Sequence, residues 1–95
     1  MRLSTPGNFE ILQYLDEHGR NVAANIHVGI DKSRGYVNSE LPKLNDQGLV
    51  RKIGPNPNSG LYEMTAKGRA ALKHREKYGH DDVDFEALVE QELDS

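Results

Sequence analysis

Residues 35–50 read GYVNSELPKLNDQGLV, and this stretch decides the fold. Val37, Leu41 and Leu44 follow the spacing i, i+4 and i+7, which places three apolar side chains on one face of a helix. We therefore predict a helix over about 33–47, with these three side chains in the core.

Both ends of this helix carry residues typical of helix termini, and the residues after it alternate as in β-strands. Ser33 is a good N-cap residue, and Gly48 is a good terminating residue. Leu49–Ile53 and Leu61–Met64 read as two short strands, because β-branched and aromatic residues mix with polar ones at a period near 2. The segment 54–60, GPNPNSG, consists of turn residues. These features predict a β-hairpin with an extended tip.

Two helices are predicted before the central one. A first helix over about 5–18 can be capped by Thr5 and is followed by a glycine. A second, short helix over about 21–28 can be capped by Asn21 and is ended by Gly29.

Further helical segments follow the hairpin. Thr65 can cap a helix from Ala66 to about Tyr78. The remaining apolar residues are spaced as in an amphipathic helix that could serve as a dimerisation seam: Phe85, Leu88, Val89 and Leu93.

The order helix, helix, helix, two-stranded hairpin, helix is that of a winged helix-turn-helix domain, a mainly α fold with a small β-hairpin (α+β). Residues 35–50 resemble the recognition helix and first wing strand of winged-helix repressors. Residues 61–68, LYEMTAKG, resemble the second wing strand and the start of the next helix. More narrowly, the pairing of ELPKL (40–44) with GPNPNSGLY (54–62) is similar to the haloarchaeal winged-helix proteins related to the phage phi-H repressor. The resemblance covers about residues 5–78 and implies an archaeal transcriptional repressor that binds double-stranded DNA.

Pro42 interrupts the pattern of the central helix. A proline lacks the N–H that would bond to residue 38 and clashes with that carbonyl, which costs roughly 3 kcal/mol in a helix interior. We expect Pro42 to kink or split the helix.

The outward face of the central helix carries the residue types that groove insertion requires. Asn38 and Ser39 are predicted to contact base edges, since an Asn side chain can bond to adenine at two points. Arg34 and Lys43 are predicted to hold phosphates, and Tyr36 to do either. The predicted DNA-binding set of this helix is Ser33, Arg34, Gly35, Tyr36, Asn38, Ser39 and Lys43. In the wing it is Lys52, Asn56, Asn58 and Ser59.

Other interpretations of the same residues stay open. Exposed polar side chains on any helix can be solvated surface alone, and a tip rich in Pro, Asn and Gly can exist for turn geometry alone. The same fold can also act as a protein-interaction module without binding DNA. An enzyme is disfavoured, because the chain shows no nucleophile elbow, phosphate loop or buried carboxylate pair. We predict no cofactor, no small-molecule ligand, no catalytic residue and no metal site, since the four His lack ligand spacing and Cys is absent.

Charge divides the 95-residue chain into two parts. Residues 1–80 hold 12 Lys and Arg against 8 Asp and Glu, whereas residues 81–95 hold 7 acidic residues and no basic ones. We predict a binding domain over 1–80 and an acidic C-terminal segment over 81–95, which is either a dimerisation helix or a frayed tail. With 36% hydrophobic residues the core is small, which favours a homodimer. The absence of Cys and of a long apolar run favours a cytoplasmic protein without a membrane partner.

Overall fold

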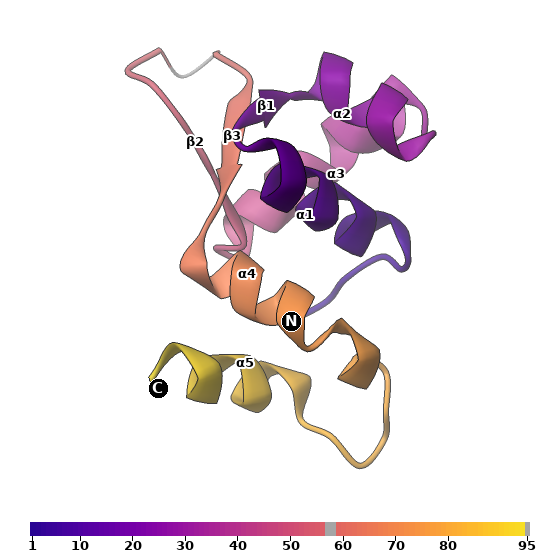
Figure 1. Ribbon diagram of the computed structural model, residues 1–95, viewed down its shortest axis with the longest axis vertical. Coiled ribbons are helices and arrows are strands. Elements are labelled where there is room, and N and C mark those ends of the chain that lie inside the picture. The colour runs from indigo at the N-terminus through magenta and orange to yellow at the C-terminus, as the bar shows by residue number, and fades with distance from the viewer. Residues whose placement is uncertain (57–58, 95) are drawn as a thin grey trace.

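The computed structural model describes residues 1–56 and 59–94 (Figure 1). The elements follow the chain in this order: α1 (Gly7–His18), β1 (Asn21–Val22), α2 (Ala23–Ile30), α3 (Arg34–Asp46), β2 (Val50–Lys52), β3 (Leu61–Met64), α4 (Ala66–Lys73), the 3₁₀ helix η1 (Arg75–Lys77) and α5 (Phe85–Leu93). Among the described residues, no helix is long and apolar enough to cross a membrane.

Helix α3 forms as its sequence predicts. Val37, Leu41 and Leu44 are each at most 1% exposed, and the Ser33 hydroxyl accepts a hydrogen bond from the Tyr36 amide at 3.0 Å. Pro42 lies inside the helix and does not split it. Pro42 is on the solvent-exposed face, where water can satisfy the carbonyl that loses its intrahelical partner.

The sheet has three strands in the order β1-β3-β2, one strand more than predicted. All pairs are antiparallel, and Asn21 lies opposite Tyr62 in β3. The predicted capping role of Asn21 was therefore wrong: the N-cap position of α2 is Val22, and no side chain caps it. The Asn21 carboxamide instead accepts hydrogen bonds from the Val22 amide at 3.1 Å and from Asn25 at 2.7 Å. A strand of two residues is too short to show a periodicity.

Gly29 does not end α2, as was predicted, but lies within it. The helix continues to Ile30 and ends at Asp31, which adopts a left-handed conformation with φ of 57°. A Cβ atom on Gly29 would stand 2.2 Å from Cε2 of Tyr14 in α1. The glycine gives room to the Tyr14 ring where α1 and α2 approach closely, and the backbone does not turn there.

The outer helices also differ from prediction at their ends. Helix α1 begins at Gly7, with Pro6 at the cap position, so the predicted Thr5 cap was wrong. Helix α4 is capped by the Thr65 hydroxyl as predicted, but it stops at Lys73 and the chain continues as η1. This change of path directs the Tyr78 ring onto Phe9 and Phe85, with centroids 5.7 and 5.1 Å apart.

The acidic segment folds back on the domain as α5, which packs along α4 (Figure 1). Phe85 and Val89 belong to the same hydrophobic core as α1 and α3. Figure 1 shows α5 at the opposite end of the long axis from the hairpin. Seven of the 15 acidic residues are thus placed far from the wing.

Candidate nucleic-acid interface

A groove of about 470 Å³ lies between α3, the start of α2 and the β2–β3 hairpin. Its floor includes Leu41 and Tyr62, which are 1% and 6% exposed. Its polar lining consists of four residues that the sequence analysis selected: Arg34, Asn38, Lys52 and Ser59. The fold thus brings together side chains from the predicted helix and the predicted wing.

The orientation of Lys52 follows from the register of the hairpin. Lys52 lies opposite Tyr62, and its ammonium stands 5.9 Å from the centroid of the Tyr62 ring. The neighbouring Arg51 points to the other face of the sheet, because side chains alternate along a strand. There Glu63 forms ion pairs with Arg51 and with Arg20. Lys52 is therefore the basic side chain of β2 that faces the groove.

Of the α3 side chains predicted to bind DNA, three are exposed and have no intramolecular hydrogen bond or ion pair with any described residue: Arg34, Asn38 and Ser39. Beside them, Gly35 has open space where a Cβ atom would stand. This face offers donors and acceptors to an external partner, and Gly35 leaves open space next to Arg34.

The other predicted residues of α3 have partners within the chain. Ser33 caps the helix. The Tyr36 ring is half-buried against Gly7, and its hydroxyl lies 3.3 Å from that of Ser4. The Lys43 ammonium forms an ion pair with Glu40 at 3.2 Å. Ser33 thus has the capping role that the sequence predicted, whereas Tyr36 has a structural role that its residue type did not reveal.

At the tip of the hairpin, Asn56 and Ser59 are exposed, and the Ser59 amide donates to the Asn56 carbonyl at 3.1 Å. The Ser59 hydroxyl donates to the Ile53 carbonyl at 2.8 Å and closes the base of the tip. Asn58, the remaining residue predicted for the wing, lies outside the described residues.

Asn8 and Glu40 form a buried polar contact that sequence reasoning missed. The Asn8 carboxamide donates to the Glu40 carboxylate at 3.0 Å, and the two residues are 2% and 7% exposed. The same carboxamide accepts from the Ser4 amide at 2.9 Å. The contact joins the start of α1 to the middle of α3, and so holds the orientation of the exposed face of α3. The only signal in the sequence was a polar residue beside the apolar stripe of α1.

The acidic helix α5 pairs with basic residues of α4. Glu90 lies 3.6 Å from Lys67, and Glu92 lies 3.2 Å from Lys73 and 2.9 Å from the His74 ring. Hydrogen bonds from His74 and Lys73 lower the pKa of Glu92 below its ordinary value. Among residues 1–56 and 59–94, no group of His, Asp or Glu is arranged to hold a metal ion.

The four residues predicted for dimerisation differ in exposure. Phe85 and Val89 are 7% and 0% exposed and pack within their own chain. Leu88 is half-buried, and Leu93 is 38% exposed.

Comparison with known proteins identifies the fold of this chain. No protein-family model and no curated protein matches the chain. A solved structure of a MarR family protein from Bacillus stearothermophilus is similar, with a TM-score of 0.65 and 17% sequence identity over 97% of this chain and 71% of that one. This likeness confirms the prediction of a winged helix fold.

Proposed function

We propose that this chain is a transcriptional regulator, in the simplest case a repressor, that binds double-stranded DNA with α3 in the major groove and the β2–β3 hairpin as its wing. The observation that carries the proposal is the groove between these two elements. Its cationic and amide side chains come from both elements, and its α3 side chains have no intramolecular polar partner among the described residues.

The roles of the side chains follow from their chemistry. The Asn38 carboxamide has one donor and one acceptor edge, which suits two hydrogen bonds to adenine and about 1–3 kcal/mol of base discrimination. Ser39 lies next to it on the exposed face and can donate or accept at a base edge. Arg34 and Lys52 stand on either side of the groove and would contact phosphates, which supply affinity without sequence preference.

The charge distribution supports this assignment. The net charge is −3, yet seven of the 15 acidic residues lie in the segment 81–94 at the other end of the long axis, where Glu90 and Glu92 pair with α4 (Figure 1). At physiological ionic strength the Debye length is about 8 Å, so that repulsion between α5 and the DNA that contacts the wing is screened over the length of the domain.

Fluorescence anisotropy tests the proposal, with random duplex and with DNA flanking the gene that encodes the chain, over a series of salt concentrations. The double variant Asn38→Ala with Ser39→Ala is expected to lose preference for the flanking DNA and to keep salt-dependent binding to both duplexes. Gln13→Ala is the control, because this amide lies on α1 and bonds to Glu17 and Arg75 away from the groove. If the native chain binds neither duplex at any salt concentration, the proposal fails and a protein-interaction module becomes the better interpretation.

A homodimer with two α3 helices about one DNA turn apart, roughly 34 Å, belongs to the same proposal. Leu93 and the half-buried Leu88 are the larger apolar residues of α5 that stay accessible for it. Light scattering on the native chain and on Leu93→Glu tests this: a dimer that the variant leaves intact would remove α5 from the interface. The narrower resemblance to the haloarchaeal repressors is likewise proposed, and protein–DNA binding that persists at molar salt would support it.

A further inference from the structure

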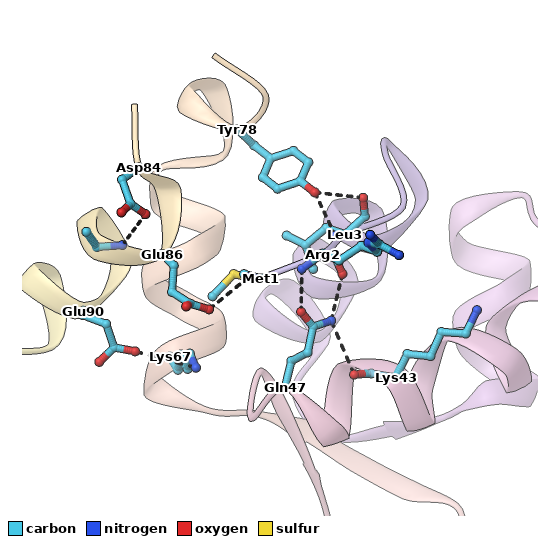
Figure 2. A network of polar contacts seen from close by, with 11 residues as sticks. Met1, Arg2, Leu3, Lys43, Gln47, Lys67, Tyr78, Asp84, Glu86 and Glu90 are labelled. Carbon is cyan, nitrogen blue, oxygen red and sulfur yellow. Dashed lines mark hydrogen bonds and ion pairs between the residues drawn. The ribbon is translucent and has the colours of Figure 1, made fainter. Parts of the chain in front are cut away.

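The N-terminal segment lies along the flank of α3 that faces away from the hairpin. The Gln47 carboxamide holds it at two points: the Arg2 amide donates to Gln47 at 2.8 Å, and Gln47 donates to the Arg2 carbonyl at 2.9 Å (Figure 2). The backbone of Arg2 is therefore fixed against the C-terminal end of α3.

The residues on either side of Arg2 are held as well. Leu3 is 6% exposed, and its amide and carbonyl both bond to the Tyr78 hydroxyl, at 2.9 and 3.2 Å. The amino group of Met1 forms an ion pair with Glu86 of α5 at 3.0 Å (Figure 2). The segment is thus anchored by three separate parts of the chain, whereas the Arg2 side chain is exposed and has no partner among the described residues.

Arg2 and Lys43 line one groove of about 470 Å³ together with Glu40, Asp46 and Gln47. Of the α3 side chains in this groove, Lys43 is cationic, whereas Glu40 and Asp46 are anionic. The net charge of these three side chains is negative, so this flank of α3 alone would repel a phosphate. The guanidinium of Arg2 offsets the excess negative charge.

Helix geometry relates this groove to the one that faces the wing. At about 100° per residue, Arg34 and Asn38 lie on one flank of α3, whereas Lys43 and Gln47 lie on the other. Ser39 lies between the two flanks, on the ridge opposite the core. A helix with its side chains is about 10–12 Å wide, which matches the roughly 12 Å width of the major groove. The two flanks of an inserted helix therefore face the two phosphate backbones.

We propose that the N-terminal segment is a third DNA-contacting element, in which the Arg2 guanidinium binds a phosphate of the strand opposite to the one that Arg34 and Lys52 contact. Gln47 is the positioning residue that holds Arg2 there. This inference rests on the proposed function, since it assumes that α3 enters the major groove.

The test measures the salt dependence of binding to the same duplexes for Arg2→Ala, Arg2→Lys and Gln47→Ala. Each phosphate contact contributes a slope of about −0.9 to a plot of log affinity against log salt. Arg2→Ala is expected to reduce the magnitude of the slope by about 1 and to weaken binding to the flanking and random duplexes to the same extent. Arg2→Lys is expected to keep most of the slope. Lys73→Ala is the matched control, because it removes one positive charge from the surface that carries α5. Thermal unfolding of each variant separates lost binding from lost folding.

Two further measurements make the assignment specific. A set of duplexes is made in which each carries one neutral methylphosphonate in place of a phosphate. At one position this replacement should weaken DNA binding by the native chain several-fold and leave DNA binding by Arg2→Ala unchanged. Adding Gln47→Ala to Arg2→Ala should weaken binding no further, because Gln47 acts through Arg2.

The outcomes separate the two proposals. If the native chain binds DNA and the Asn38 and Ser39 variants lose specificity, but Arg2→Ala keeps the native slope, the N-terminal contact is overturned and the proposed function stands. If the native chain binds no duplex, both fail.

Discussion

Asn8 donates a hydrogen bond to Glu40 across 3.0 Å, although 32 positions separate them in the chain. Glu40 is 7% exposed, and its other carboxylate oxygen lies 3.2 Å from the Lys43 ammonium. The pair links the start of α1 to the middle of α3.

Replacement of Asn8 by Ala should therefore destabilise the fold. Glu40 would lose a buried donor, and an unsatisfied buried polar group costs about 1–3 kcal/mol. Urea unfolding at pH 7 measures the loss. Glu17→Gln on the exposed end of α1 is the control and should change the free energy of unfolding little. Native stability in Asn8→Ala would show that water replaces the amide without cost.

Two glycines in helices should respond oppositely to the same added methyl group. A Cβ atom on Gly68 would stand 2.1 Å from the Leu49 carbonyl oxygen, a backbone atom that cannot move aside easily. Gly68→Ala should therefore lower the free energy of unfolding by about 1–3 kcal/mol or more. A Cβ atom on Gly35 would have no atom within 4 Å. Gly35→Ala should therefore leave the free energy of unfolding unchanged or raise it by less than about 1 kcal/mol. If α3 enters a groove closely, Gly35→Ala should nevertheless weaken DNA binding in the anisotropy assay.

Ser33 allows the structural and binding roles of one residue to be separated. Its hydroxyl accepts from the Tyr36 amide at 3.0 Å, so Ser33→Ala should cost about 1 kcal/mol of stability. Ser33→Asp keeps a capping oxygen and should restore stability, but adds a negative charge at the start of α3. Weaker DNA binding by the Asp variant alone would place Ser33 near phosphate, and equal binding by both variants would leave it a purely structural cap.

The contact between α4 and α5 should weaken in acid. Hydrogen bonds from His74 and Lys73 lower the pKa of Glu92 in the folded state. A lowered folded-state pKa contributes stability that is fully present above the unfolded value, near pH 4.3, and is lost as the pH falls through the folded value. Chemical unfolding between pH 7 and pH 3 should show this loss, and Glu92→Gln should show less of it. An identical pH profile for both proteins would exclude Glu92 as the cause.

Several elements were predictable because their signals are local. The cap of α3 lies three residues from the amide that it accepts from, and the apolar stripe repeats within one helix, so that both are visible in a short stretch of sequence. The same holds for the Thr65 cap and for the turn residues between β2 and β3. Each of these depends on backbone geometry that neighbouring residues impose.

Other features had no local signal. Asn21 resembled a helix cap, but its backbone pairs with Tyr62 in β3, and Gly29 resembled a helix end, but it gives room to Tyr14. In both cases a partner distant in the chain determined the outcome, because tertiary pairing and close packing override local preference.

By itself, the sequence determined the order of the α-helices and of the β2–β3 hairpin, the core face of α3 and the set of polar residues proposed to contact DNA. The tertiary structure alone decided which of those residues have partners and which stay exposed: Lys43 pairs with the buried Glu40, whereas Asn38 faces the groove with Lys52. It also placed Arg2 beside Gln47, 45 positions away. The physical reason is that a side chain's hydrogen bonds and exposure depend on atoms close in space, and for these residues the closest atoms belong to distant parts of the chain.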